Sequence, residues 1–225
     1  MAALLVKKRS AQISQLLWLD TTYNAVRLRY LAGRSTSGNR DHGAFVFTNT
    51  GVPCLRGLNI KPARIDRQNL LYIDETTSRT HSNTILRFDD LVIVRSGFAG
   101  SAALVPPDLG GCNCVDLVLV RKSSTLIPRY LEYVVNSDRA QEQVRQKSSG
   151  ALLSHFNAVD AGDIIVPRRE LSQQERLVAE LDRACSKIDR TLDLIQGQIL
   201  LLEEHRQALI TAAVTGEMDV PGVST

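Results

Sequence analysis

The sequence predicts a mixed α/β (α+β) body followed by one long α-helix. Up to Pro167, short β-rich runs alternate with turn residues, whereas residues 172–215 carry an uninterrupted helical pattern of apolar side chains. The 225 residues are 44% hydrophobic and 23% charged, which is ordinary for a soluble globular protein. This composition excludes a disordered, collagen-like or disulfide-stapled chain.

The body is predicted to start with two short helices, residues 10–19 and 25–32. Pro128 suits the first position of a later helix, expected over residues 129–147, which Ser148-Ser149-Gly150 would end. Between and after these helices, runs of β-branched and aliphatic residues bounded by turn residues predict strands. The strand candidates are residues 44–49, 52–55, 65–73, 91–95, 102–105, 115–120 and 164–166.

Residues 172–215 have the pattern of a long, projecting helix. Ser172 is a suitable N-cap, with Glu175 three residues later, and Gly216 is a natural stop. At 1.5 Å per residue the helix is about 65 Å long, so a body of this size cannot cover it and a partner helix is expected. Its apolar residues repeat every seven positions in two rows, as in a coiled coil. The residues expected on this dimerisation seam are Val178, Leu181, Cys185, Ile188, Leu192, Ile195, Ile199, Leu202 and Leu209.

The alternative for this segment is an ordinary core helix of a bundle. Gly197 favours that alternative, because a glycine inside a helix costs about 1 kcal/mol. Gly197 falls on the outward side of the heptad, however, and leaves the seam intact. Arg206 on the seam would weaken an isolated helix pair but can specify its register.

Cysteine and charge usage are compatible with a cytoplasmic protein that binds nucleic acid. The four cysteines include no CxxC pair, so free thiols are expected and a zinc site is not. The apolar run at residues 2–6 is too short for a membrane span or a signal sequence. Residues 1–167 carry 20 Lys and Arg against 14 Asp and Glu, whereas residues 168–225 carry 7 against 10. A basic body permits contact with nucleic acid.

No catalytic or metal-binding constellation is evident in the sequence. The four histidines are scattered, with no pair at helical spacing for a metal ion. Asp89 and Asp90 precede a strand, where adjacent side chains face opposite sides. The glycines of residues 96–100 lack the lysine and spacing of a phosphate loop, and a turn between strands is the better interpretation. We therefore expect no enzymatic activity and no metal or cofactor bound by this chain.

Three polar loops carry side chains that can hydrogen-bond to bases and phosphates, namely residues 34–40, 56–61 and 77–83. For each loop alone a solvated turn is the simpler interpretation, but several together on a basic body favour nucleic acid. The DNA-binding candidates are Arg34, Ser35, Ser37, Asn39, Arg40, Arg56, Asn59, Lys61, Arg79, His81, Ser96, Lys147 and Ser149.

Several segments resemble the specificity subunit of type I restriction–modification enzymes. Residues 171–182, 187–189 and 204–216 are similar to the conserved helical region that closes each target-recognition domain in that family. The ending Ala-Val-Thr-Gly-Glu-Met-Asp-Val, residues 213–220, is the most specific part of the match. Weaker similarity extends the resemblance over residues 18–220. Two departures are Gln173-Gln174, where an acidic residue and Gln are usual, and Arg168 in place of a second proline.

The resemblance implies an N-terminal extension (1–17), a target-recognition domain (18–167), a long helix for antiparallel coiled-coil pairing (168–216) and a tail (217–225). Family members usually contain two such domains and two helical regions, so a half-length form that pairs as a homodimer is expected, with a truncated product as the alternative. The resemblance implies a non-catalytic reader of double-stranded DNA.

The partners implied by the resemblance are a DNA methyltransferase (modification) subunit, which uses S-adenosylmethionine to methylate adenine, and a translocating restriction endonuclease subunit, which uses ATP and Mg²⁺. Two alternatives from other classes remain. One is a dimeric coiled-coil DNA-binding regulator without enzyme partners, and the other is a coiled-coil scaffold that binds no DNA.

Overall fold

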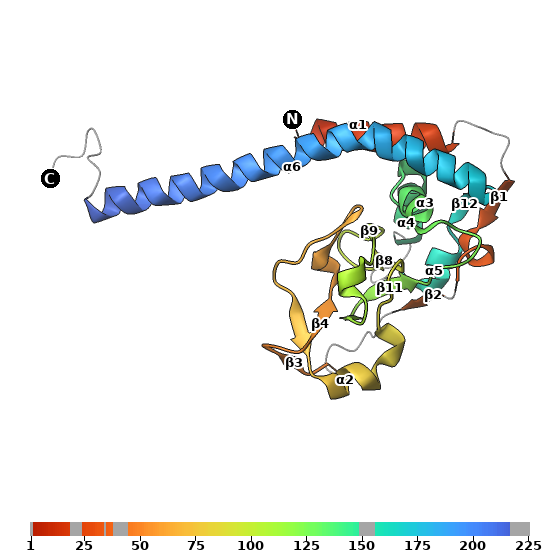
Figure 1. Ribbon diagram of the computed structural model, residues 1–225, viewed down its shortest axis with the longest axis horizontal. Helices are drawn as coiled ribbons and strands as arrows, with labels where there is room; N and C mark the ends of the chain where they lie inside the picture. Colours follow the sequence, from red (N-terminus) through yellow and green to blue (C-terminus); the bar gives the residue numbers. More distant parts are fainter. Residues whose placement is uncertain (1, 19–23, 34, 38–44, 149–155, 217–225) are drawn as a thin grey trace.

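The computed structural model describes residues 2–18, 24–33, 35–37, 45–148 and 156–216. Within these residues the chain has two parts, a body built on two small sheets and a long helix along its upper edge (Figure 1). The predicted fold class is confirmed.

The central sheet of the body has four antiparallel strands, and both of its faces are covered. Its strands, in spatial order, are β2 (Ser35–Ser37), β11 (Leu117–Val120), β8 (Leu91–Val94) and β9 (Ala102–Leu104). Leu91 and Ile93 lie in one apolar cluster and Val92 and Val94 in another, because successive strand residues point to opposite faces. The continuous apolar run of β8 therefore reflects burial on both sides.

A second sheet packs below the central one, away from the long helix. Its strands, in spatial order, are β10 (Asn113–Cys114), β4 (Val52–Leu55), β7 (Leu71–Ile73) and β3 (Phe47–Thr48), with β10 and β4 parallel. The short helix α2 (Glu75–Thr80) lies at the lower end of the body (Figure 1). The remaining described strands form two antiparallel pairs: β1 (Asn24–Arg27) with β12 (Ile165–Arg168), and β5 (Ile60–Lys61) with β6 (Arg64–Ile65).

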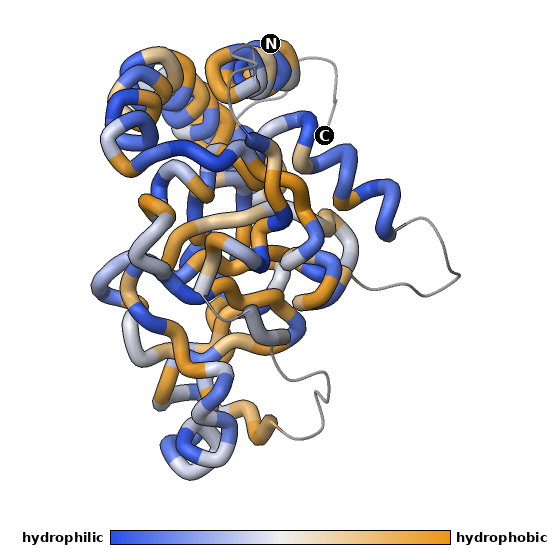
Figure 2. The backbone as a smooth tube through the Cα atoms, turned by 90° about the vertical axis from the view of Figure 1, so that its right-hand side faces the viewer, coloured by the Kyte–Doolittle hydropathy of each residue, from blue (hydrophilic) through white to orange (hydrophobic). Residues whose placement is uncertain are grey.

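Four helices cover the upper face of the central sheet. They are α1 (Ala2–Trp18), α3 (Pro128–Val135), α4 (Asp138–Ser148) and, at the strand edge, α5 (Ala158–Gly162). Ile13 and Leu17 of α1 and Tyr130 of α3 are almost fully buried in the same apolar cluster as Leu91. In Figure 2 the strands through the middle of the body are mostly hydrophobic, and two helices lie side by side at its upper edge.

The helix α6 (Leu171–Thr215) has 45 residues, about 67 Å at 1.5 Å per residue. α1 lies alongside its first half, and its second half extends beyond the body (Figure 1). It ends at Gly216, which has a φ of 76°, as predicted for a C-terminal glycine. Its N-cap differs from the prediction: Glu170 occupies that position in a capping box with Gln173, and Ser172 is already inside the helix.

The covering of the first half corrects the predicted pairing seam. Leu181 and Cys185 are fully buried and Ile188 is almost so, against this chain's own helices. They therefore cannot face a second chain. They are covered because residues 2–18 form one helix, α1, that packs on α6. This segment was predicted as an N-terminal extension (1–17), and the predicted boundary after residue 17 falls inside α1.

Three further predictions were wrong in detail. Residues 25–32 form β1 and a 3-10 turn instead of a helix, because pairing with β12 outweighs the local helical pattern. The predicted strand 65–73 is interrupted, with Asn69 at a φ of 54° in the turn between β6 and β7. The helix predicted over 129–147 breaks after Val135, where the Asn136 side chain bonds both backbone groups of Ala102.

Along the described part of the chain, no helix is both long and apolar enough to cross a membrane.

Candidate nucleic-acid interface

The first polar loop is only partly within the described residues. Arg34, Asn39 and Arg40 lie outside them, as does Ser149. Ser35 belongs to β2, an edge strand of the central sheet that pairs with Val120 of β11. Ser37 ends the same strand and pairs with Val118. The described part of this loop, Ser35–Ser37, therefore lies at one edge of the central sheet.

The second loop is mainly structural, which corrects the assignment of Asn59 to DNA. The Asn59 side chain is 1% exposed. Its Oδ1 accepts from the Arg56 backbone N–H at 3.0 Å, and its Nδ2 donates to the carbonyls of Asp66 and Gln68, both at 3.1 Å. Since its donors and acceptor are used inside the loop, Asn59 cannot reach a base.

The other two candidates of this loop point in different directions. The Arg56 guanidinium donates from Nη2 to the Asn69 carbonyl at 3.0 Å, which ties the loop to the turn before β7. Lys61 lines a cleft beneath α6. The assignment of Arg56 and Lys61 to DNA stays a prediction.

The third loop forms α2 and the turn after it, at the end of the body farthest from α6. Hydrogen bonds from the backbone and side chain of Thr77 lower the pKa of Asp74, which caps α2. The Arg79 side chain is 79% exposed, and among the described residues its ion-pair partner is Glu75, one turn earlier, so its guanidinium remains accessible. His81 stacks on Phe45, with ring centroids 4.6 Å apart.

A buried polar cluster holds α2 on the body. Asn113 of β10 accepts from the Ser78 hydroxyl at 2.6 Å and donates to the Thr84 hydroxyl at 2.9 Å. The second turn of α2 and the turn that follows it are thereby bonded to β10 of the second sheet, which positions Arg79 at the tip.

The turn between β8 and β9 carries the candidate Ser96. Its hydroxyl donates to Asp116 at 3.2 Å, and Asp116 also pairs with the buried Arg95 at 3.3 Å. Gly97 has a φ of 74°, a conformation that other residues rarely adopt, and Phe98 at the tip is 84% exposed. The turn therefore presents an aromatic side chain to solvent on a fixed base.

A basic cluster around Asp163 was missed except for Lys147. Asp163 pairs with Arg27 at 3.4 Å and with Lys147 at 3.9 Å, and Arg29 also donates to it. Three cations on one carboxylate leave a local positive excess. They come from β1, α4 and the turn after β1, so only the folded chain brings them together. The cluster borders a hollow of about 410 Å³ lined by Arg29, Gly33 and Ser35.

The junction between body and long helix centres on Asp182. Arg129 donates to its Oδ1 from Nε at 3.1 Å and from Nη2 at 2.9 Å, and the Tyr133 hydroxyl donates to the same oxygen at 2.6 Å. The second carboxylate, Glu132, is 2% exposed; burial raises its pKa, and Arg129 opposes that rise. At the start of α6, Gln174 bonds Ile127 and Thr125, a second tie to α3.

The cysteines lie inside the body and the helix packing. All four are free and buried. Burial raises the pKa of the Cys54 thiol to about 12, and it also raises the pKa of Cys112 and Cys185. These thiols stay protonated near neutral pH and are poor nucleophiles or metal ligands.

Comparisons with known proteins give one consistent result. No protein-family model matches the chain. It is 22% identical over 176 residues to the type I restriction enzyme StySPI specificity subunit of Salmonella potsdam, covering 74% of this chain and 36% of that protein.

Solved structures match the fold. A structure of the type I restriction–modification system aligns with a TM-score of 0.65 at 16% identity, over 94% of this chain and 53% of the other. The HsdS subunit from Thermoanaerobacter tengcongensis aligns at 0.61 and 16% identity, over 96% and 52%. The S subunit from M. genitalium aligns at 0.59 and 13% identity, over 92% and 54%. The chain thus spans about half the length of these solved relatives. The resemblance predicted from the sequence is confirmed: in sequence and in fold, this chain is similar to the specificity subunit of type I restriction–modification enzymes.

Proposed function

We propose that this chain is a non-catalytic, sequence-specific DNA-binding specificity subunit. In this role its body reads one half of a bipartite target in double-stranded DNA. The observation that carries the proposal is the match over more than nine-tenths of this chain to specificity subunits, body and projecting helix together. Two described groups are best suited to contact bases and phosphates. They are the exposed Arg79 on α2 and the cations around Asp163.

The second half of α6 supports pairing with a second helix. Leu202 is 67% exposed, and Ile199 and Leu209 are 49% and 41% exposed. These three belong to the predicted heptad rows, and no described part of this chain covers them. We propose that the occupant is the same half of α6 in a second copy of this chain, running antiparallel. The pairing surface is then Ile195, Ile199, Leu202 and Leu209, with the covered residues Leu181, Cys185 and Ile188 removed from it. Val178, which packs on the apolar cluster of the body, and Leu192, which lines the cleft beneath α6, are also left out of it.

The partners and cofactors follow from this role. The homodimer would direct a DNA methyltransferase subunit, which holds S-adenosylmethionine, and a restriction subunit, which holds ATP and Mg²⁺. The chain itself would bind no cofactor, and it would act in the cytoplasm where these partners and the DNA are. A regulator without enzyme partners would bind DNA but would not co-purify with a methyltransferase.

The test is to express the tagged chain with a type I DNA methyltransferase subunit and to recover bound sequences from random DNA at physiological salt. Co-purification together with one enriched motif supports the proposal; failure to enrich any sequence contradicts it.

A second measurement concerns the phosphates. Arg27→Ala or Lys147→Ala should flatten the decline of log K with log salt by about 0.9 per lost contact. The control is Arg176→Ala on the exposed side of α6, which should leave the slope unchanged. Equal salt-dependence slopes for the wild type and all variants would show that the Asp163 cluster does not contact DNA phosphates.

A further inference from the structure

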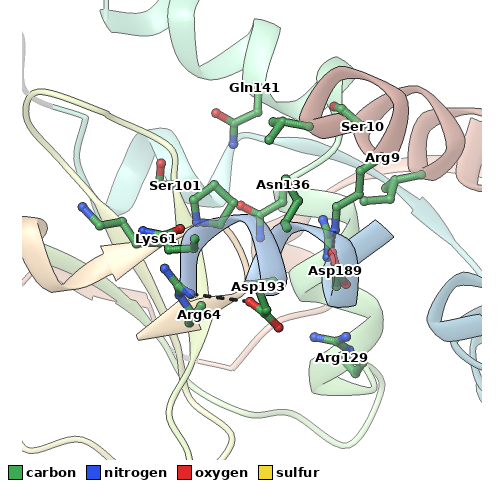
Figure 3. Close-up of a pocket in the computed structure, with 16 residues that line it drawn as sticks. Arg9, Ser10, Lys61, Arg64, Ser101, Arg129, Asn136, Gln141, Asp189 and Asp193 are labelled. Carbon is green, nitrogen blue, oxygen red and sulfur yellow. Dashed lines mark hydrogen bonds and ion pairs between the residues drawn. The ribbon is translucent and has the colours of Figure 1, made fainter. Parts of the chain in front are cut away.

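Besides its packing on α1, its buried Leu181 and Cys185 and the Gln174 hydrogen bonds, α6 makes two polar contacts with the body that have an open cleft between them. The first is at Asp182, which accepts hydrogen bonds from Arg129 and Tyr133 of α3. The second is the tip of the β5–β6 hairpin, where Arg64 lies 3.8 Å from Asp193. The cleft between them has a volume of about 540 Å³, and Figure 3 shows it lined by Lys61, Arg64 and Asp189. Between these two contacts the cleft separates the β5–β6 hairpin from α6.

The two contacts differ in strength. Arg64 and Asp193 have side chains that are 53% and 72% exposed, so solvent screens this long ion pair and it contributes little. At Asp182 one carboxylate oxygen accepts three hydrogen bonds within 3.1 Å, two of them from a guanidinium. Of these two contacts, the one at Asp182 therefore restrains the angle between the body and α6 more strongly.

The Asp182 contact is connected to the central sheet by a series of hydrogen-bonded side chains, of which Glu132 and Tyr133 are buried. Arg129 also donates to Glu132, and its guanidinium stacks over the Tyr133 ring at 4.6 Å. Glu132 in turn accepts from the Leu104 backbone N–H of β9 at 2.9 Å. Glu132, Arg129 and Asp182 thus form a continuous line of hydrogen bonds from β9 to α6. We call Arg129, Glu132, Tyr133 and Asp182 the junction clamp.

We propose that the junction clamp sets the tilt of the recognition body and thereby selects the spacer between the two half-sites. The inference rests on the proposed function, because a spacer exists only when two bodies read one DNA molecule. The length of α6 sets the approximate distance between the two bodies. The junction clamp sets the angle of each body on its helix, and this angle determines the final distance between them. Asp182 and Arg129 are then positioning residues that contact no DNA.

The test is Asp182→Ala, measured on DNA with two half-sites and spacers from two base pairs shorter to two longer than the selected one. The ratio of affinity between the best and next-best spacer should fall by about threefold to tenfold, the order expected for losing a partly exposed charge-assisted contact. Affinity for a single half-site should stay within about twofold of the wild type. Glu180→Gln is the matched control, an exposed position on the same helix that loses the same charge.

Spacer selectivity equal to wild type in Asp182→Ala would overturn the inference, and so would an equal loss of affinity for single half-sites. A wild-type chain that selects no sequence would refute the proposed function instead.

A DNA-free measurement keeps the inference testable in that case. Spin labels at Arg79→Cys and Gln207→Cys, both exposed, report the distance between body and helix in protein diluted with unlabelled chain. The native thiols are buried and should not label. The distance distribution should broaden in Asp182→Ala, and an unchanged width would overturn the inference.

Discussion

The two halves of α6 carry the same heptad pattern but have different surroundings. In the first half, Leu181 and Cys185 have no exposed surface, because α1 and α3 pack on them. In the second half, Ile199 and Leu202 of the same rows are 49% and 67% exposed. A heptad rule treats both halves alike, since it responds only to spacing. The difference shows that one pattern can serve the core of a chain in one half and association in the other.

The largest expected effect lies in the covered half. Leu181→Ala removes a fully buried side chain and leaves a cavity, so the free energy of unfolding should fall by about 2–5 kcal/mol. Denaturant unfolding measures it. A loss below about 1 kcal/mol would show that this half is not part of the core.

The uncovered half should affect association and leave folding intact. Leu202→Asp places a charge in the pairing surface of both copies, and the dimer dissociation constant should rise about a hundredfold or more. Thermal stability of the body should stay unchanged. Sedimentation at micromolar concentration measures the effect, with Gln207→Asp, exposed and outside the heptad rows, as control. A wild-type chain that is monomeric on its own would contradict homodimer pairing.

A smaller effect is expected at the edge between α1 and α6. Arg9 of α1 pairs with Asp189 of α6, and their side chains are 13% and 39% exposed. Arg9→Ala should lower the free energy of unfolding by about 1 kcal/mol or less, because water screens the pair. Lys8→Ala, an exposed neighbour, should have no effect. A decrease in the free energy of unfolding as large as that of Leu181→Ala would mean that the Arg9–Asp189 ion pair, and not apolar packing, holds α1 on α6.

The smallest effect concerns alkaline pH. Burial raises the pKa of Cys185 above its ordinary value, so the folded chain keeps this proton when the unfolded chain has lost it. Stability should therefore decline as pH rises from the ordinary thiol pKa towards the folded one. A thiol reagent at pH 8 should leave Cys185 unmodified until denaturant is added. Rapid modification of the native chain would indicate that α1 detaches from α6.

Features with a local signal could be predicted from the sequence. The apolar run of β8, the strand β11 and the long helix with its terminal Gly216 follow from residue type and spacing alone. The segment 25–32 could not be predicted, because its partner strand β12 lies about 140 residues later. The same applies to α1, whose role depends on a helix near the other end of the chain.

The candidate site was less predictable for the same reason. Asn59 and Arg79 both stand in polar loops, and only the folded chain shows that one is buried and the other exposed. The cluster around Asp163 joins residues from three separate segments and leaves no pattern in the sequence. Side-chain burial and long-range ion pairs are properties of the fold.

The most direct test of two identical bodies held apart by paired α6 helices is the DNA motif methylated when this chain is expressed with its methyltransferase and no other specificity polypeptide. Two identical chains related by a two-fold axis must read a target with the same symmetry. The account predicts a bipartite palindrome whose halves are separated by an unread spacer of fixed length. An asymmetric motif, with different sequences in its two halves, would contradict it.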